Sequence, residues 1–96
     1  MTRLITYSVY IMSNKHHTVF YTGVTSNLES RVLQHKLGES TFTAKYNVDH
    51  LLFYEDFSEV KNAIAREKQL KKWRREWKLD LIKKENPLMQ DLAADW

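Results

Sequence analysis

Two neighbouring runs of strand-forming residues near the start of the chain constrain its fold most. Residues 5–12 alternate between an apolar series and a more polar series, which is the pattern of a strand. Residues 18–24 are rich in β-branched and aromatic side chains and predict a second strand. Because the polar residues 13–17 between them indicate a hairpin loop, we expect the two strands to pair antiparallel.

A helix is expected directly after this hairpin. Ser26 followed by Glu29 has the pattern of a capping box, with the serine as the N-cap. The helix should run over about residues 27–37 and end near Gly38, since glycine readily adopts the left-handed conformation that often ends helices. Residues 39–50 are polar and predict an irregular connection.

A third strand and two further helices follow. Residues 51–57 predict the strand, and Ser58 can cap a helix over residues 59–73. A last helix is expected over about residues 76–84 and should end before Pro87, because proline disfavours helical conformation in the residue that precedes it. The tail carries apolar side chains that we expect to dock on the body: Leu88, Met89, Leu92 and Trp96.

Together these elements predict an α/β fold of the α+β kind, as a single domain over residues 1–96. A small, mostly antiparallel three-stranded sheet should be flanked by helices in the order β-β-α-β-α-α. The chain contains no cysteine, which excludes disulfides, thiol nucleophiles and zinc sites with sulfur ligands. No run approaches the roughly 20 apolar residues of a membrane span, and residues 1–5 lack the apolar core of a signal peptide. We therefore expect a cytoplasmic protein with no membrane partner.

Positive charge is concentrated in one later stretch of the chain. Residues 66–84 hold nine basic and three acidic side chains, a local charge of +6 against +3 for the whole chain. A basic helical stretch that also carries tryptophan suits a polyanion such as nucleic acid. The alternative is a solvated helix face whose lysines serve helix propensity alone, and this feature by itself favours neither interpretation.

Arg31 and His35 lie four residues apart on the first helix and therefore share one face. Leu28 and Val32 share another face, which should point to the core. For an arbitrary arginine and histidine, a solvated polar face is the commoner explanation. The pair also places a guanidinium beside an imidazole, which makes it a candidate for chemistry.

Glu67 stands out on the second helix because it falls inside an apolar arc. The arc consists of Val60, Ala63, Ile64 and Leu70. Burying a carboxylate is costly unless it is paired or binds a metal. Periodicity leaves two interpretations open: a pair with an interior arginine or tyrosine hydroxyl, or a ligand to Mg²⁺, which keeps much of its water shell.

Tyr10 and Tyr21 fall on the two paired strands, where tyrosine is ordinarily a packing residue. Gly23 follows Tyr21 by two residues. A glycine inside a strand often marks the close approach of another group. These three residues gain meaning only together with those on the helices.

The candidate residues occur in a recognisable order. From the N-terminus they are Ser8-Val9-Tyr10, Tyr21-Thr22-Gly23, Asn27-Leu28 with Arg31, His35, Arg66-Glu67 and Asn86-Pro87. This ordered set resembles the GIY-YIG nuclease superfamily, in the short stand-alone form that is similar to the N-terminal domain of excision-repair nucleases. The stretches YTGVTSNLESRV and AIAREKQLKKW carry the resemblance most closely. Ser8 and Thr22 stand where the motif names have glycine and isoleucine, and neither position carries a reacting group.

The resemblance implies both a fold and an activity. Members of the family have a three-stranded antiparallel sheet flanked by helices and cleave phosphodiesters with one divalent metal, here Mg²⁺ or Mn²⁺. Carried over, Glu67 binds the metal, Arg31 stabilises the negative charge on phosphorus, and Tyr10 with His35 activates water. Tyr21 completes the catalytic set. The expected nucleic-acid contacts are Lys68, Lys71, Lys72, Arg74, Arg75 and Asn86.

We therefore expect a metal-dependent endonuclease, with DNA as its substrate and DNA repair as its setting. The first alternative is a non-catalytic nucleic-acid-binding module of the same fold. The second is a protein-interaction domain with an acidic partner. The third is a nuclease that needs a protein partner to supply its target, since the chain has no separate recognition domain. Removal of the metal distinguishes the first alternative, because binding would survive where cleavage would not.

Overall fold

Strand β1, Tyr7–Ser13, forms the centre of a three-stranded sheet with the order β2-β1-β3. It pairs antiparallel with β2, Phe20–Thr25, and with β3, His50–Phe57. The computed structural model describes residues 5–96. The expectation that residues 1–4 begin no signal peptide lies outside the described residues. The predicted fold class and the antiparallel sheet are confirmed.

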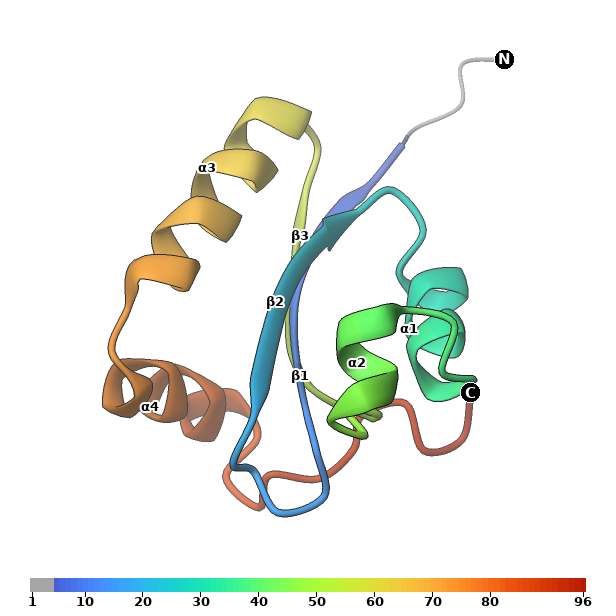
Figure 1. Cartoon of the computed structure of the whole chain (residues 1–96). Coiled ribbons are helices and arrows are strands. Elements are labelled where there is room, and N and C mark those ends of the chain that lie inside the picture. The colour runs from blue at the N-terminus through green and yellow to red at the C-terminus, as the bar shows by residue number, and fades with distance from the viewer. Residues whose placement is uncertain (1–4) are drawn as a thin grey trace.

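Among the described residues, four helices cover the two faces of the sheet (Figure 1). Helices α1, Leu28–Lys36, and α2, Thr41–Lys45, lie on one face, and α3, Val60–Lys72, and α4, Arg75–Glu85, lie on the other. The predicted order is confirmed, with α2 as a short addition inside the connection that was expected to be irregular. No helix within residues 5–96 has the length and apolar character to cross a membrane.

The helix ends show where local sequence signals were right and where they were wrong. Asn27, not Ser26, is the N-cap of α1, and its side chain accepts a hydrogen bond from the backbone N–H of Ser30. Gly38 follows α1 with a φ of +74°, as expected of a glycine that ends a helix. The predicted cap at Ser58 is also wrong, because Glu59 precedes the first turn of α3 and makes no side-chain capping bond.

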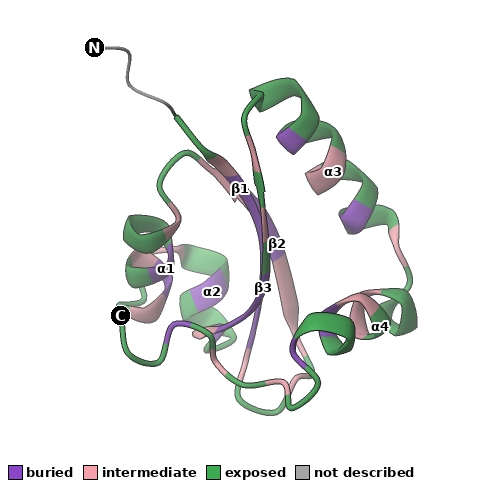
Figure 2. Ribbon diagram, turned by 180° about the vertical axis from the view of Figure 1, so that it is seen from behind, coloured by how far each residue is buried: buried purple, intermediate pink, exposed green. Residues whose placement is uncertain are grey.

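The core has two layers, one on each face of the sheet, as the purple segments in Figure 2 show. The layer under α3 and α4 contains Val9, Ile11, Leu52, Phe53, Ala63, Leu70 and Ile82. The layer under α1 and α2 contains Tyr10, Met12, Val32, Val48, Leu51 and Ala93. Because β1 is covered on both faces, its residues from Ser8 to Ser13 are all buried. Tyr10 therefore faces the α1–α2 layer.

Helix α3 presents a narrower apolar stripe to the sheet than its sequence predicted. Ala63 and Leu70 are fully buried, whereas Val60 and Ile64 are 43% and 38% exposed. A helix resting on a three-stranded sheet buries one stripe, and in α3 the flanks of that stripe lie open to solvent. Glu67 lies between Ala63 and Leu70 in helical spacing, so it belongs to the inward-facing stripe.

The tail after α4 docks mainly through polar groups. Asp91 accepts hydrogen bonds from Lys36 Nζ at 2.5 Å and from the backbone N–H of Leu51 and Ala93 at 3.0 Å each. Burial would raise the pKa of Asp91, but these three donors outweigh it and lower that pKa. Leu88 and Trp96 are 76% and 50% exposed, so their predicted docking is wrong. Met89 packs against the core as predicted, Leu92 is 40% exposed, and Ala93 adds an apolar contact that was not predicted.

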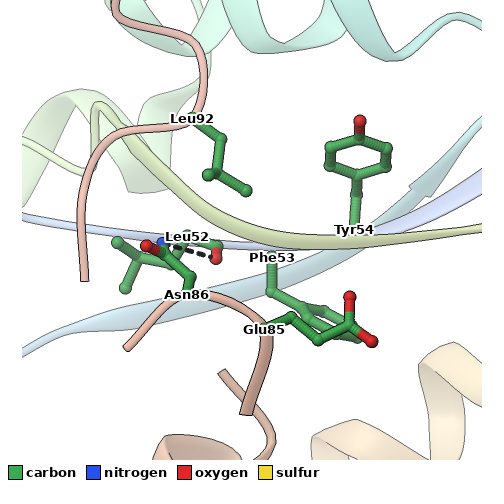
Figure 3. Close-up of a pocket in the computed structure, with 6 residues that line it drawn as sticks. All are labelled: Leu52, Phe53, Tyr54, Glu85, Asn86 and Leu92. Atoms are coloured by element: carbon green, nitrogen blue, oxygen red, sulfur yellow. Dashed lines mark hydrogen bonds between the residues drawn. The ribbon is translucent and has the colours of Figure 1, made fainter. Parts of the chain in front are cut away.

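Asn86 joins the tail to the edge strand β3. Its amide nitrogen donates to the carbonyls of Leu52 at 3.0 Å and Gln90 at 2.8 Å, and its oxygen accepts from the Gln90 N–H at 3.1 Å. Figure 3 shows the bond to Leu52 beside a pocket of about 260 Å³ that Tyr54 and Leu92 also line. These bonds give the buried Asn86 a structural role.

Replacing Asn86 with alanine should destabilise the fold by about 1–3 kcal/mol, because buried carbonyls lose their donor. The free energy of unfolding in urea measures the effect. Glu85→Ala, at an exposed neighbouring position, is the control and should stay close to the parent. Unchanged stability in Asn86→Ala would contradict the structural role.

Candidate active site

Tyr10 occupies its position because Gly23 lies opposite it on β2. A Cβ atom built on Gly23 would lie 2.5 Å from the Tyr10 hydroxyl and 2.6 Å from Cζ, far inside contact distance. The phenol ring therefore crosses directly over the glycine. The expectation that Gly23 marks a close approach is confirmed. The ring of Tyr21 lies beside that of Tyr10, with centroids 6.1 Å apart.

His35 is the hydrogen-bonding centre of the site. It is 2% exposed, and its Nε2 lies 2.8 Å from the Tyr10 hydroxyl. Its Nδ1 lies 3.0 Å from Thr43 Oγ1 on α2. The Thr43 hydroxyl donates its single proton to the Ser40 carbonyl at 3.3 Å, so it can only accept from His35. We therefore assign the proton to Nδ1, and Tyr10 then donates to Nε2.

Thr43 was not predicted as a site residue. It lies in the polar connection after α1, where the sequence shows no periodicity, and it is 1% exposed in the structure. The signal that could have pointed to it is indirect. A buried imidazole that bonds a phenol through one nitrogen needs a partner at the other. Its identity becomes visible only when α2 folds against α1.

Arg31 lies at the solvent edge of this cluster. It is one turn before His35 on α1, as predicted, and Nη1 donates to Gln34 Oε1 at 3.2 Å. The neighbouring phenol of Tyr10 raises the pKa of Arg31 further, so the guanidinium is a permanent cation. A charged, exposed group beside two buried neutral ones gives the site an anion-facing side.

The pKa shifts in the cluster favour uncharged forms. Burial raises the pKa of Tyr10 to about 12, which exceeds the lowering by Arg31. Burial and then the charge of Arg31 lower the pKa of His35. At neutral pH the phenol and the imidazole are therefore both neutral, and the imidazole is free to accept a proton.

Glu67 lies on a different helix from Arg31 and His35. It lies on α3, which covers the opposite face of β1 and β2, and its carboxylate is 3.5 Å from Lys71 Nζ. Its side chain is 13% exposed, and Lys71 is an exposed partner rather than an interior arginine or tyrosine. The structure thus brings Tyr10, Tyr21, Arg31 and His35 together. The meeting of Glu67 with them stays a prediction.

The oxygen donors on the α3 side fit a hydrated hard cation. Among residues 5–96 no group of three or more histidine, cysteine or acidic side chains could hold a metal, so a cage of protein ligands is excluded there. Glu67 offers one carboxylate with a loose ionic partner. Thr22 pairs with Ile11, whose side chain belongs to the core layer under α3, so Thr22 also faces α3. Its buried hydroxyl has no hydrogen-bond partner. One carboxylate with water is sufficient for Mg²⁺ or Mn²⁺.

Comparison with known proteins identifies the family. Residues 6–80 match the family model described as the GIY-YIG catalytic domain. The chain belongs to the GIY-YIG family of nucleases. The matched range includes all five predicted catalytic residues, whereas Asn86 lies beyond it. The catalytic roles of these five residues and the nucleic-acid contact of Asn86 stay predictions.

Proteins similar to this GIY-YIG chain carry names that state no activity. A UPF0213 protein of Staphylococcus haemolyticus is 35% identical over 75 residues, which is 77% of this chain and 90% of that protein. One of Clostridium perfringens is 37% identical over 75 residues, 77% of this chain and 80% of that protein. The solution NMR structure of a UPF0213 protein of Bacillus halodurans covers 95% of this chain and 98% of its own, with a TM-score of 0.56 and 24% identity, and supports the fold.

The basic residues of this GIY-YIG domain differ in their contacts. Lys68 and Lys72 are exposed, and the exposed Arg74 lies over the Trp77 ring, 5.6 Å from its centroid. Burial and the nearby charge of Lys71 lower the pKa of Lys78, which shows that cations crowd where α3 meets α4. Arg75 donates to the carbonyls of two residues in the hairpin turn and stacks 5.1 Å from a ring on β2; these partners are His17, Thr18 and Phe20. Arg75 therefore also holds α4 to the hairpin.

Gly23→Ala should displace the Tyr10 ring and break its bond to His35. We expect a loss of about 1–3 kcal/mol in unfolding free energy from overpacking and a fall in cleavage of up to about 10²-fold from misplacement. Gly38→Ala is the matched control, because its strain of about 1–2 kcal/mol comes from a positive φ away from Tyr10. Equal cleavage by the two variants in their folded states would contradict the role of Gly23.

Proposed function

We propose that this chain is a metal-dependent endonuclease that hydrolyses phosphodiester bonds in nucleic acid, with DNA as its substrate. The observation that carries the proposal is the hydrogen-bonded series from Tyr10 through His35 to Thr43, with Arg31 beside it. It provides a proton acceptor and an anion-binding cation in one place. The family membership supports the same reaction class.

His35 is the proton acceptor in the proposed mechanism. Because Tyr10 donates to Nε2 of His35, the phenol oxygen keeps lone pairs that can accept from an attacking water. Tyr10 is 0% exposed, so the proposed mechanism requires neighbouring side chains to move aside and admit that water when substrate binds. A phenol with a pKa of about 12 is a poor base by itself. As water loses a proton to the Tyr10 oxygen, the phenol proton passes to Nε2. The hydroxide bonds to phosphorus, and the bond from phosphorus to the leaving oxygen breaks.

A bound phosphate would strengthen His35 as a base. In the free protein, burial and Arg31 hold the pKa of His35 low. A phosphate anion beside Arg31 compensates that positive charge and favours the imidazolium that the reaction forms. Thr43 accepts from Nδ1 throughout and keeps the ring in the required orientation. Substrate binding and base strength are therefore coupled.

Arg31 is the proposed stabiliser of the transition state. Its planar guanidinium matches two phosphate oxygens at once, and its exposure leaves it accessible to substrate. Negative charge that grows on the phosphate oxygens during attack is then met by a fixed cation. Tyr21, whose ring lies 5.1 Å from that of His35, completes the wall of the site and can hydrogen-bond the water or the phosphate.

Mg²⁺ or Mn²⁺ held by Glu67 and water would polarise the phosphate and stabilise the leaving oxygen. Exposed basic side chains of α3 and the loop after it would hold the flanking phosphates: Lys68, Lys71, Lys72 and Arg74. β2 is an edge strand of the sheet, and α3 partly covers it. A nucleic-acid backbone that passes this edge would contact α3 on one face of the sheet and the Tyr10–His35 cluster on the other. Binding should therefore weaken steeply as salt increases.

A second candidate follows because Glu67 lies on α3, which covers the other face of the sheet from α1. A domain whose carboxylate does not reach the phenols would bind nucleic acid without cutting it, or would cut only when a protein partner completes the site. Metal dependence distinguishes these functions. A non-catalytic module would bind equally with and without a chelator, and no metal would elicit cleavage.

The deciding experiment is a cleavage panel of DNA and RNA substrates with Mg²⁺, Mn²⁺ or EDTA. We expect cleavage with either metal, none with EDTA, and binding in all three conditions. Cleavage that persists in EDTA would refute the metal requirement. Binding without cleavage in every condition would favour the non-catalytic module.

The pH dependence of kcat/KM should show one acid limb. Protonated His35 cannot accept the phenol proton, so the rate falls as pH decreases through the pKa of His35. Because that pKa lies below its ordinary value of 6.5, full activity is expected at neutral pH. His35→Gln should lower the rate and abolish the limb. A limb centred above neutral pH would contradict the role of His35.

A further inference from the structure

An aromatic series leads outward from the proposed active site. The ring centroids of His35 and Tyr21 are 5.1 Å apart, those of Tyr21 and Phe42 are 5.9 Å apart, and those of Phe42 and Tyr46 are 5.0 Å apart. The series begins at the buried imidazole and ends at Tyr46, the C-cap residue of the short helix α2. We call Tyr21, Phe42 and Tyr46 the aromatic track.

The outer members of the aromatic track are open to solvent. Phe42 is 43% exposed and Tyr46 is 40% exposed, although each contacts the next ring. The ring planes of Tyr21 and Phe42 are tilted by 38°, and those of Phe42 and Tyr46 by 50°, so neither pair is stacked face to face. Much of each ring is therefore available to a ligand. Lys45 Nζ lies over the Tyr46 ring, 5.4 Å from its centroid, so it covers part of one face and places a cation at the outer end.

We propose that the aromatic track stacks unpaired bases next to the scissile phosphate, so that the substrate of this site is single-stranded on one flank. The inference rests on the proposed nuclease function, whose site the track continues. Aromatic rings bind the faces of unpaired bases with little sequence preference. Bases inside a closed duplex already stack on one another and present no free face to the protein.

Exposed aromatic rings and nearby cations favour a nucleic-acid strand as the occupant. Lys45 beyond the track and Arg31 at its inner end supply cations for the phosphates on either side. These two cations disfavour a second copy of the chain as the occupant, because the chain itself has a net charge of +3.

The test compares binding of single strands and duplexes in EDTA, where cleavage does not interfere. Fluorescent oligothymidylate and a blunt duplex are titrated with the parent, Phe42→Leu and Tyr46→Ala, and anisotropy reports the dissociation constant. Each variant should bind the single strand roughly fivefold to 100-fold more weakly, because it loses one stacked base. Duplex binding should stay within about twofold of the parent value.

Two variants separate stacking from general effects. Phe42→Trp keeps an aromatic face and should bind the single strand as the parent does, whereas Phe42→Leu keeps only apolar bulk. Val60 lies on α3, on the opposite face of the sheet, and is 43% exposed, as Phe42 is. Val60→Ala should therefore change the binding of neither the single strand nor the duplex. Tyr46→Ala keeps the test decisive if the Phe42 variants misfold, because Tyr46 lies at the exposed outer end of the track.

The outcomes separate this inference from the proposed function. If no metal elicits cleavage while Tyr46→Ala still loses single-strand binding, the track is upheld and the nuclease is refuted. If the protein cleaves but both variants bind single strands as the parent does, the track is refuted. Loss of self-association in Tyr46→Ala, measured by sedimentation, with single-strand binding intact would assign the surface to a second copy and also refute the track.

Discussion

Arg31→Ala is expected to lower the single-turnover cleavage rate by about 10²- to 10³-fold while the protein stays folded. The guanidinium is the permanent cation beside the Tyr10–His35 pair, so its loss removes the charge that meets the phosphorane. Arg31 is exposed, and its hydrogen bond to Gln34 is on the surface, so its removal should hardly change the free energy of unfolding. Rates at saturating enzyme measure the chemical step free of substrate affinity.

The controls for Arg31 follow from its contacts. Gln34→Ala removes the partner of the guanidinium and should cleave at nearly the parent rate. Arg31→Lys keeps the charge without the planar fork and should fall between the parent and the alanine variant. Because the charge of Arg31 lowers the pKa of His35, the acid limb of Arg31→Ala should move to higher pH. Cleavage by Arg31→Ala within about threefold of the parent would refute its role.

The strands and the long helices could be predicted because their side chains repeat with the period of the backbone. The centre of β1 is buried on both faces, so Val9 and Tyr10 both become inaccessible while still pointing to different layers. Helix ends were less predictable. Thr25 and Asn27 bond at the end of β2, with the Asn27 N–H 3.1 Å from the threonine hydroxyl, and this turn makes Asn27 the cap instead of Ser26.

Helix α2 could not be predicted because local propensity does not stabilise five residues as a helix. Its stability comes from contacts made elsewhere in the fold. Thr43 bonds the buried His35, and Phe42 packs against Tyr21. For the same reason the sequence could identify His35 but not the residue that orients its ring. Side chains fixed by tertiary contacts leave no periodic signal.

The four clustered site residues were predicted from the resemblance to the GIY-YIG family, and local signals supported that prediction for some of them. Gly23 indicates a close approach, and the register of β1 and β2 puts Tyr10 over it. The spacing of Arg31 and His35 gives them one helix face. Glu67 was recognised from its place in an apolar stripe, which the structure retains between Ala63 and Leu70. Its partner was not predictable, because Lys71 binds it from the solvent side.

Glu67→Gln is expected to reduce metal-dependent cleavage at least about 10²-fold, to the level seen with chelator. Glutamine keeps the size of the side chain and loses the charge that attracts a divalent cation. Stability should change little, because an ion pair of 3.5 Å with a half-exposed lysine on the same helix contributes at most about 0.5 kcal/mol. The apparent affinity for Mg²⁺, from rates against metal concentration, is the measurement.

Lys71→Met separates the metal role of Glu67 from its ion pair. Both variants break the contact between Glu67 and Lys71, but only Glu67→Gln removes a metal ligand. Lys71→Met should weaken substrate binding in a salt-dependent way and keep its response to Mg²⁺. A second measurement needs no substrate: high Mg²⁺ should raise the melting temperature of the parent and of Lys71→Met, and leave Glu67→Gln unchanged. If Glu67→Gln cleaves as the parent does, the carboxylate holds no catalytic metal, and α3 serves this domain only as a basic, nucleic-acid-facing helix.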